Sequence, residues 1–593
     1  MPRAAPPGAR PTERTPMYVK EAERPATTRG DAYRPAFLAV VVFAAALLAM
    51  PGWARAAAAP PAPWWRHAVI YEIYPRSFAD SNNDGTGDLR GIAAHLDYLQ
   101  TLGVNAIWIT PFYPSPQVDF GYDISNYRAI DPRYGTLADF DALLRAAHRR
   151  HIKVLLDMVL NHTSDQHPWF QASRSSRQSP YRNFYIWRDG KNGGPPNNWT
   201  SLFGGSAWQY DARTGQYYYH FFYRQQPDLN WRNPAVEKAM FANVRFWLER
   251  GVDGFRLDAV TTLFEDPKLR DNPPGLIHTG DFGPPQQKHV YNQGLPEVNG
   301  VLKRLRRLAD RYHAVLIGET VGQTEARLAE YYGHGDEIQL PFDFLFADVN
   351  RLSAPAFRHR IAAWVHNPAH GTPDWFFDNH DQRREIDRYG DGVHDAQIAR
   401  LLPTMLLTLP GTAILYYGQE IGMVTTDPTS EDQVRDPIGR RWWPKYKGRD
   451  GERTPMQWSA GPDAGFCSSC RPWLPIPASA ARVNVAAEEK QPESLLSYYR
   501  RLIHLRDAEP ALVNGDWAAL DAENPNVLIY RRRTAGETVL VALNMSAAPR
   551  TEHLTSAAPA GQVLIDSRGR TGALALSDLR LQPYESLVLR LKR

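Results

Sequence analysis

Acidic side chains stand at the ends of three separate apolar segments of the chain. Asp258 closes VDGFRLD, Glu319 closes AVLIGE, and Asp381 lies two residues beyond DWFFDN. Arg256 precedes Asp258 by two residues. Carboxylates that meet repel one another, so the core of a fold gains nothing from bringing them together. Three of them beside a guanidinium therefore indicate a reaction site.

Paired carboxylates are the working groups of glycoside hydrolysis. One carboxylate attacks the sugar or activates water, while its partner carboxyl delivers a proton to the departing oxygen. The donor must hold its proton near neutral pH, and neighbouring negative charge raises its pKa in that direction. Glycoside hydrolysis is therefore the leading hypothesis for this group of acids.

A divalent-metal site is the competing chemistry for the same residues. Barrel enzymes also bind Mg²⁺ or Zn²⁺ through carboxylates and imidazoles. His162 and His380 follow two of the apolar segments and are available as ligands. The chain has neither an H-x-H nor an H-E-x-x-H spacing, which weakens this alternative without removing it.

Strand-like apolar runs alternate with helical patterns from residue 64 onward. Helices are expected over 137–151 and 234–250, among others. The eight candidate strands are 68–74, 105–110, 153–159, 252–258, 314–319, 337–342, 374–379 and 412–417. This alternation predicts an α/β fold, a (β/α)8 TIM barrel, in which residues at the strand C-termini face the active site.

Two stretches depart from the barrel pattern. The connection after the third strand is rich in Asn, Gly, Ser, Tyr and Trp, and its length predicts an inserted subdomain over the barrel mouth. Short alternating runs after a helix expected over 495–506 predict a C-terminal antiparallel β-sandwich. The expected division is a leader over 1–60, the barrel over 61–162 and 231–511, the insertion over 163–230, and the sandwich over 512–593.

The amino-acid composition limits the class of protein and the kinds of binding partner. The 43% hydrophobic and 22% charged residues are those of an ordinary globular protein, which excludes a disordered chain and a multi-span membrane protein. A net charge of +4 on 593 residues gives no reason to invoke nucleic acid. We expect a small-molecule substrate, no nucleic acid and no stable membrane partner; the sequence does not set the oligomeric state.

A short apolar run near the N-terminus indicates export. Phe37–Met50 is shorter than the roughly 20 residues that cross a bilayer. Arg29 and Arg34 precede it, and Ala54–Ala56 supplies an A-x-A cleavage pattern. We expect a secretory signal and an exported, periplasmic or secreted protein. An uncleaved anchor extended through Trp53 is the alternative.

Signature segments carry a family resemblance. DMVLNH (157–162), GFRLD (254–258), GE (318–319) and NHD (379–381) resemble the four ordered segments of the α-amylase family, glycoside hydrolase family 13. QPDLN (226–230) and QLPFD (339–343) resemble its oligosaccharide-cleaving branch of α-glucosidases, oligo-1,6-glucosidases and trehalose synthases. The resemblance covers about residues 64–590 and implies that the insertion and the sandwich are the family's domains B and C.

The resemblance implies a role for each acid. Asp258 would be the nucleophile, and Glu319 the general acid and then the general base. Asp381 would grip substrate hydroxyls and stabilise the transition state, while Arg256 would orient Asp258. The implied mechanism is retaining double displacement, for which the two reacting carboxyls stand about 5–5.5 Å apart.

The resemblance also implies a set of substrate-binding residues. The two histidines would bond the sugar, the Asp and Tyr of DFGY would hold and stack on the terminal glucose, and an arginine would close the pocket. Two phenylalanines would form its walls, with core packing as their alternative. These residues are His162, His380, Asp119, Tyr122, Arg384, Phe203 and Phe222.

An Asx-rich loop after the first strand has the pattern of a metal site. Oxygen side chains fall at alternate positions, a glycine allows the sharp turn, and the loop lacks the twelfth-position glutamate of an EF-hand. A simple turn is the alternative. With the branch resemblance we expect a structural ion, Ca²⁺ or else Mg²⁺. The ligand set would be Asp80, Asn82, Asp84, Thr86 and Asp88.

Two further features remain open at this level. The two cysteines, Cys467 and Cys470 in FCSSC, are too few for a structural zinc site, and a small surface disulfide or free thiols are the options. The residue after the proposed nucleophile, Ala259, resembles the α-1,4 type of the branch, where a valine is associated with α-1,6 cleavage. A difference of this size is typically worth about 1–3 kcal/mol, so it sets a preference.

The expected activity is therefore removal of terminal α-1,4-linked glucose from maltose and short malto-oligosaccharides. A trehalose synthase or a transglucosidase of the same family would share every catalytic residue. A membrane-anchored, transporter-associated subunit without activity is the alternative from another class, and retention of Asp258, Glu319 and Asp381 weighs against it.

Overall fold

The computed structural model describes residues 63–275, 287–321, 324–366, 371–520, 524–554 and 558–591. The expected leader, with its apolar run and cleavage pattern, lies outside the described residues. Within the described ranges, no helix is both long enough and apolar enough to cross a membrane.

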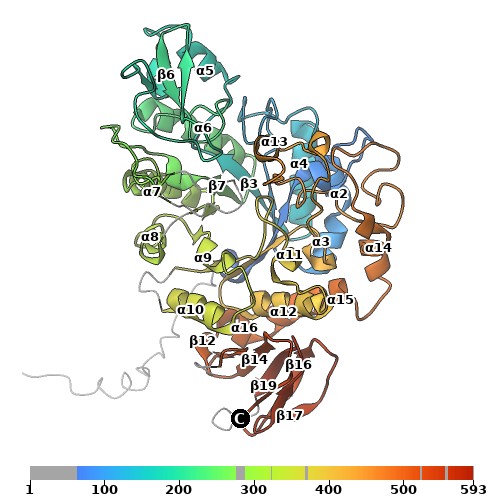
Figure 1. Cartoon of the computed structure of the whole chain (residues 1–593). Helices are drawn as coiled ribbons and strands as arrows, with labels where there is room; N and C mark the ends of the chain where they lie inside the picture. Colours follow the sequence, from blue (N-terminus) through green and yellow to red (C-terminus); the bar gives the residue numbers. More distant parts are fainter. Residues whose placement is uncertain are drawn as a thin grey trace, which may run out of the picture. The chain divides into compact units, whose positions relative to one another are not determined.

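Eight parallel strands form the sheet that organises residues 63–515 (Figure 1). Their order is β10-β11-β1-β2-β3-β7-β8-β9. The strands are β1 (Val69–Ile73), β2 (Ala106–Ile109), β3 (Lys153–Val159), β7 (Gly254–Asp258), β8 (Val315–Gly318), β9 (Leu340–Pro341), β10 (Asp374–Trp375) and β11 (Thr412–Tyr416). Each lies within one of the eight expected segments, so the predicted barrel is confirmed.

Alternate residues of each barrel strand face opposite sides of the sheet. Ile70, Leu155 and Ile317 belong to the barrel's interior cluster, whereas Val69 and Val154 pack in the larger cluster with the helices. Strands buried on both faces read as continuous apolar runs, which is why periodicity located them. Continuing the interior register toward the strand C-termini brings the side chains of 72, 157, 256, 258 and 319 inward.

Helices follow the strands and begin where their sequences supply N-terminal caps. In α4, Thr136 and Asp139 form a reciprocal capping box, and in α6 Asn233 accepts the N–H of Ala235 ahead of Pro234. The helices over the barrel are α1 (Pro75–Phe78), α2 (Leu89–Ala94), α3 (Leu96–Leu102), α4 (Leu137–Arg149), α6 (Pro234–Glu249), α7 (Glu297–Asp310), α8 (Glu325–Glu330), α9 (Phe344–Ala347), α10 (Ala354–Val365), α11 (Glu385–Tyr389), α12 (Asp395–Thr408), α13 (Pro437–Trp442), α14 (Val485–Glu488), α15 (Leu495–Ala508) and α16 (Pro510–Asn514).

The insertion after β3 has a small core of its own. It contains α5 (Pro168–Ser173) and an antiparallel sheet of β4 (Trp187–Arg188), β6 (Gln216–Tyr219) and β5 (Trp208–Asp211). Trp199, Trp208 and Phe221 are among its buried residues. A bridge between His162 and Asp228 joins the two ends of the insertion at the barrel rim.

The C-terminal region is an antiparallel assembly of a six-stranded and a two-stranded sheet. The larger has the order β12-β13-β14-β19-β16-β17 and the smaller pairs β15 with β18. The strands are β12 (Asp516–Ala519), β13 (Val527–Arg533), β14 (Thr538–Asn544), β15 (Arg550–Glu552), β16 (Ala560–Asp566), β17 (Ala573–Ala575), β18 (Leu579–Leu581) and β19 (Ser586–Leu591). Leucines of both sheets share one buried cluster, as the predicted sandwich requires.

Candidate active site

One guanidinium joins the carboxylates at the C-terminal end of the barrel. Arg256, 1% exposed, donates to Asp258 at 2.7 Å and to Asp157 at 3.1 Å through Nη1. Its Nη2 lies 2.9 Å from Oε1 of Glu319. Asp157 pairs in register with Arg256 across β3 and β7. The structure therefore brings Asp258 and Glu319 onto adjacent nitrogens of a single side chain.

Backbone geometry after β7 also serves Glu319. Ala259 has φ +46° and ψ +40°, in the left-handed region. This turn aims the Ala259 N–H at Oε2 of Glu319, 2.8 Å away. Any residue with a Cβ is strained in this conformation, and a β-branched side chain is disfavoured most.

The charge balance around Arg256 favours a retained proton. Burial raises the pKa of Glu319 to about 7; Arg256 opposes the shift, while the charges of Asp258 and Asp381 add to it. Burial raises the pKa of Asp258 as well, against the nearby Arg256. Three carboxylates face one cation, so near neutral pH a proton is held within the Asp258–Glu319 pair.

Asp381 is charged under the same conditions. Its Oδ1 accepts from Arg449 at 2.9 Å and from Arg453 at 2.7 Å, and its Oδ2 lies 3.2 Å from Nε2 of His380. Burial acts to raise the pKa of Asp381, but His380 and the two arginines outweigh it and hold that pKa well below its usual range. Neighbouring acids thus differ in protonation because their cations differ.

Arg449 links Asp381 to the residues of the DFGY segment. Its Nη2 donates to Asp119 at 2.8 Å while Nη1 donates to Asp381. Buried Asp436 accepts from Nε at 2.8 Å and fixes the plane of the fork. The guanidinium also lies over the ring of Phe203, at 5.5 Å.

The expected pocket arginine, Arg384, lies elsewhere, and this prediction is corrected. Its Nη1 and Nη2 donate to the carbonyl oxygens of Tyr417 and Glu452, at 2.8 and 3.0 Å. The guanidinium is buried against the rings of Tyr416 and Tyr417. Those contacts commit both terminal nitrogens of Arg384 to backbone carbonyls, and Arg449 is the arginine that contacts Asp119 and Asp381 instead.

Tyr122 and the two histidines lie beside the acids, as the sequence predicts. The Tyr122 hydroxyl is 3.0 Å from Asp157 and 2.7 Å from Nε2 of His380, and the two rings stack within 4° of parallel. His162 places Nε2 3.2 Å from the Tyr122 carbonyl oxygen and 3.0 Å from Gln226. Burial lowers the pKa of His162 to about 3, so its imidazole is neutral.

Both predicted aromatic walls also border this group. Phe222 packs 5.2 Å from the His162 ring, and Phe203 lies 5.6 Å from Phe222 beneath Arg449. Phe203 is almost fully buried and Phe222 is half-buried. The structure therefore places Phe203 against the charged Arg449 and Phe222 against the neutral His162.

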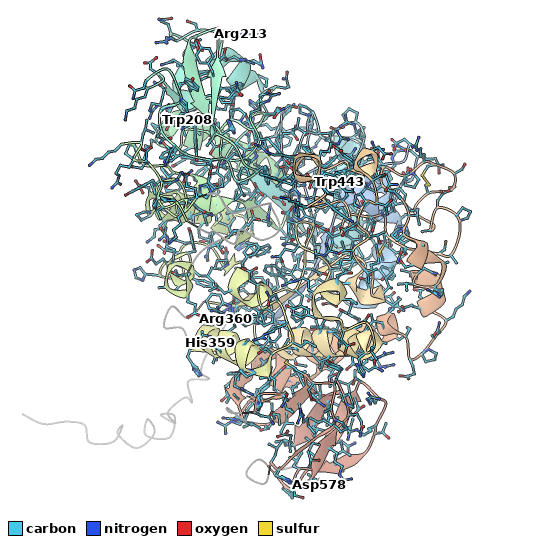
Figure 2. The ribbon with its side chains drawn as sticks, viewed as in Figure 1. Trp208, Arg213, His359, Arg360, Trp443 and Asp578 are labelled. Atoms are coloured by element: carbon cyan, nitrogen blue, oxygen red, sulfur yellow. A yellow bond between two sulfur atoms is a disulfide. The ribbon has the colours of Figure 1, made fainter. Side chains whose placement is uncertain are left out.

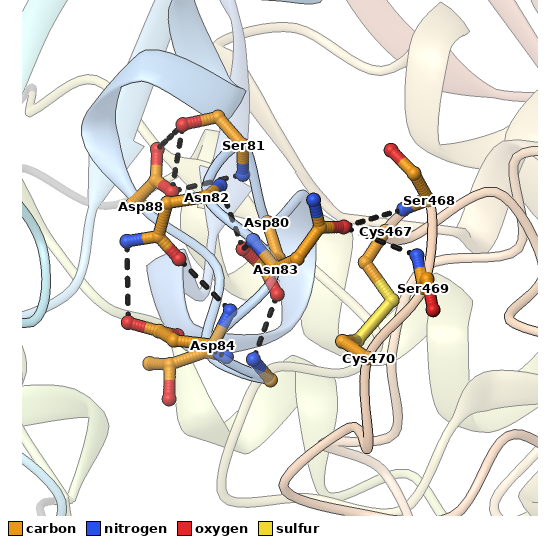
Figure 3. The surroundings of a disulfide bond; sticks show 12 residues. Asp80, Ser81, Asn82, Asn83, Asp84, Asp88, Cys467, Ser468, Ser469 and Cys470 are labelled. Carbon is orange, nitrogen blue, oxygen red and sulfur yellow. Dashed lines mark hydrogen bonds between the residues drawn. A yellow bond between two sulfur atoms is a disulfide. The ribbon is translucent and has the colours of Figure 1, made fainter.

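The Asx-rich loop is a tight turn secured by its own acids (Figure 3). Asp80 accepts the backbone N–H groups of Asn82 and Gly85 at 3.0 and 2.8 Å, and Asp84 accepts that of Thr86. Asp88 accepts from the N–H of Gly91 and caps α2. The donor set is all oxygen and suits a hard cation. In the described residues, however, the carboxylates of Asp80, Asp84 and Asp88 do not gather within 4.8 Å of one another.

The two cysteines beside this loop form a disulfide. Cys467 and Cys470 are bonded, and the backbone N–H groups of Ser468 and Ser469 donate to Asn83 (Figure 3). Their sulfurs also lie within 4.8 Å of a carboxylate oxygen of Asp80. Of the two options left open by the sequence, the structure selects the disulfide.

Four residues of this network escaped the sequence-level prediction. Arg449 and Arg453 lie in the long loop after β11, and Asp436 caps the short helix α13 in the same loop. No periodicity aligns such a loop with the strand ends. Glu72, on β1, is hidden inside an apolar run, where its interior register was the available signal.

Comparisons with known proteins agree with this geometry. Residues 72–515 match the family described as alpha amylase, catalytic domain, and residues 518–588 match the maltogenic amylase C-terminal domain. A probable alpha-glucosidase of Rhizobium meliloti is 45% identical over 84% of this chain and 92% of its own length. An oligo-1,6-glucosidase of Parageobacillus thermoglucosidasius is 37% identical over 89% and 99%.

Solved structures also superpose on most of this chain. The alpha-glucosyl transfer enzyme XgtA superposes with a TM-score of 0.83 at 43% identity, covering 89% of this chain and all of its own. The trehalulose synthase MutB of Pseudomonas mesoacidophila also gives 0.83, at 36% identity, over 90% of this chain and all of that one.

The raised pKa of Glu319 generates a prediction about pH. A group that donates a proton must hold it, so kcat/KM should fall about tenfold per pH unit once the pH exceeds the Glu319 pKa of about 7. The measurement is the pH profile on an α-glucoside with a poor leaving group. An α-glucosyl fluoride, whose departure needs no proton, is the control and should lack that alkaline limb. An identical limb with both substrates would contradict the assignment.

Proposed function

Since the chain belongs to the α-amylase family, glycoside hydrolase family 13, we propose that it is a retaining α-glucosidase. Its reaction is removal of terminal, non-reducing α-1,4-linked glucose from maltose and short malto-oligosaccharides. The observation that carries the proposal is the sharing of Arg256 between Asp258 and Glu319. One guanidinium holds both carboxyls beside a common space, as double displacement needs.

The reaction runs in two balanced steps. First, Asp258 attacks the anomeric carbon, Glu319 transfers its proton to the glycosidic oxygen, and the shortened sugar departs. Second, Glu319 removes a proton from water, whose oxygen attacks the same carbon and displaces the Asp258 carboxylate. Two inversions return the α configuration. Arg256 offsets the negative charge that moves between the two carboxyls.

A closed set of hydrogen bonds supports exo-action. Asp119, Arg449 and Asp381 are joined through one guanidinium, and Gln226 donates to Asp119 at 3.1 Å. Substrate hydroxyls would exchange for these internal contacts and be held by fixed charges. We infer that this network closes one end of the substrate site, so that a terminal glucose would fit and an internal unit of a long chain would not.

The α-1,4 preference rests on Ala259. It follows the proposed nucleophile, is 7% exposed, and sits in the left-handed conformation. A methyl group leaves room beside the reacting bond, whereas a branched side chain would project into that space. The names of relatives include both alpha-glucosidase and oligo-1,6-glucosidase, so the proposed linkage preference rests on this residue alone.

Transglucosylation is the second candidate. XgtA, named an alpha-glucosyl transfer enzyme, shares 43% identity with this chain, and the same covalent intermediate accepts a sugar hydroxyl in place of water. Trehalose synthesis from maltose would use the same acids. Retention of all three carboxylates in one network argues against a non-enzymatic, membrane-anchored subunit.

We propose a structural Ca²⁺ in the 80–88 loop. Support comes from the oxygen donors of Asp80, Asp84 and Asp88, two of them nearly buried. The ion would draw these carboxylates closer than the internal hydrogen bonds do. The ion would take no part in the reaction. Its role would be to stabilise the loop that connects the first strand to the following helix.

We also propose export through a cleaved N-terminal signal. The support is the short apolar run followed by an A-x-A pattern in residues 37–56. A disulfide between Cys467 and Cys470 fits an oxidising compartment. N-terminal sequencing of the exported protein should begin after Ala56; retention of residues 37–50 would contradict cleavage.

Product analysis tests the activity. With an aryl α-glucoside, whose only glucose comes from the cleaved bond, wild-type protein should release glucose that is α at the first moments, as observed by ¹H NMR before mutarotation. With maltose, glucose should be the main product. Asp258→Asn should lower kcat by at least about 10⁴-fold, since a neutral amide cannot form the intermediate. Initial β-glucose from the aryl α-glucoside would contradict retention. Trehalose as the main product, or glucosyl oligosaccharides at low maltose concentration, would favour the alternatives.

Ala259→Val tests the linkage preference. The ratio of kcat/KM on isomaltose to that on maltose should rise about tenfold, in line with about 1–3 kcal/mol for a change of this size. The Tm should fall, because a β-branched residue is strained at φ +46°. Ala259→Ser is the control, with a similar volume and an unbranched Cβ. An unchanged ratio in Ala259→Val would contradict the proposal.

Calcium removal tests the loop. EDTA should lower the Tm, and added Ca²⁺ should restore it, because an ion that binds the folded state alone stabilises that state. Asp84→Ala should abolish the response to both. Asp97→Ala, at an exposed acid on α3, is the matched control. A Tm that is indifferent to EDTA would remove the calcium proposal.

A further inference from the structure

Glu72 is a buried acid that the mechanism above does not use. It lies on β1 with no exposed surface, and its register partner Trp108 also belongs to the barrel interior. Its Oε1 is 2.6 Å from Nδ1 of His380. Among the described residues its Oε2 has no hydrogen-bond partner. Burying a carboxyl that makes only one hydrogen bond costs free energy of folding, so its presence here suggests a functional role.

The protonation of the neighbours can be worked out from donors and acceptors. Asp157 is paired with Arg256 and therefore accepts only. The Tyr122 hydroxyl, 3.0 Å from Asp157, must donate its one proton there. Its oxygen is left to accept from Nε2 of His380, 2.7 Å away.

The contact between Asp381 and His380 also indicates that Nε2 of His380 carries a hydrogen. Its Oδ2 lies 3.2 Å from the same Nε2, and with Arg449 and Arg453 on its other oxygen it is an ionised acceptor. A bare nitrogen lone pair at that distance would be repelled. Nε2 of His380 therefore carries a hydrogen.

The other ring nitrogen then depends on Glu72. The remaining neighbours of the ring are stacked or edge-on: Tyr122, Tyr74 and Trp108. Arg453 bonds the His380 carbonyl oxygen, not the ring. With Nε2 protonated, Nδ1 accepts a proton from Glu72 or, as an imidazolium, donates one to it. Burial raises the pKa of Glu72 and lowers that of His380, so the neutral arrangement is favoured.

We propose that Glu72 is a positioning residue. It stays protonated, donates a hydrogen bond to Nδ1, and so fixes His380 in the Nε2–H form. His380 thereby carries its one hydrogen on Nε2, where the Tyr122 oxygen at 2.7 Å and Asp381 Oδ2 at 3.2 Å share it. In the proposed glucosidase, on which this role rests, a substrate hydroxyl that donates to Asp381 would accept from this Nε2–H in place of the Asp381 contact. The two side chains would then hold one sugar hydroxyl by complementary bonds.

Two substitutions distinguish the hydrogen-bond donor of Glu72 from the space that its side chain fills. Glu72→Gln retains an N–H donor toward Nδ1 and the same volume, so kcat/KM on maltose should stay within about threefold of wild type. Glu72→Leu removes the donor, and kcat/KM should fall about 10–100-fold, the usual effect of losing a carboxyl that orients a functional histidine. The loss should appear in kcat, because a misdirected donor fails the transition state.

Glu420 offers a matched control. It is equally buried and holds Tyr71 and Tyr98 through Oε1, outside the acid network. Glu420→Leu should lower the Tm while leaving kcat and the pH profile within about threefold. If Glu72→Leu and Glu420→Leu change Tm and kcat alike, Glu72 has only a structural role.

Nitrogen NMR gives a test that needs no activity. In ¹⁵N-histidine-labelled wild type, assigned by comparison with His380→Gln, Nε2 of His380 should be protonated and Nδ1 unprotonated from pH 5 to 8. Glu72→Gln should keep this pattern. An Nδ1–H signal, an imidazolium, or a Glu72→Gln enzyme as impaired as Glu72→Leu would overturn the proposal. The NMR result stands whether or not maltose is hydrolysed.

Discussion

A shortage of positive charge around Arg256 is the constraint on which the site depends. Its guanidinium contacts the buried Asp157 and Asp258 and the partly buried Glu319 together, near the strand C-termini. Three full negative charges cannot be balanced by one cation away from water, so a proton stays in the group. The enzyme thereby keeps an acid and a nucleophile side by side at neutral pH, which two fully ionised carboxylates could not provide.

The opposite balance holds a few ångströms away. Arg449 and Arg453 both reach Asp381, and Asp436 and Asp119 occupy the rest of the Arg449 fork. Asp381 itself accepts from two guanidinium groups, so its pKa is depressed and the carboxylate remains ionised. Loops after β11 supply these arginines while the barrel supplies the acids, so a rigid frame and a less regular loop meet at the sugar site.

Residues on regular strands could be placed from the sequence, whereas residues in irregular loops could not. The eight strands and the convergence of Asp258, Glu319 and Asp381 were predictable, because period and strand ends fix where such side chains point. Arg384 was assigned wrongly, because its place three residues past Asp381 in the sequence does not determine where a long side chain in a turn points. Arg449 comes from a loop without periodicity. Glu72 hid in an apolar segment, although its alternation with Ile70 marked it as interior.

Trapping of the covalent intermediate tests the central claim most directly. A 5-fluoro-α-glucosyl fluoride should label the protein once, and peptide mapping by mass spectrometry should locate the glucosyl ester on Asp258. That result is expected if Arg256 divides its donors between an ionised attacking carboxylate and a protonated Glu319. An ester on Glu319 or Asp381, or rapid turnover to the inverted product without any adduct, would contradict the account.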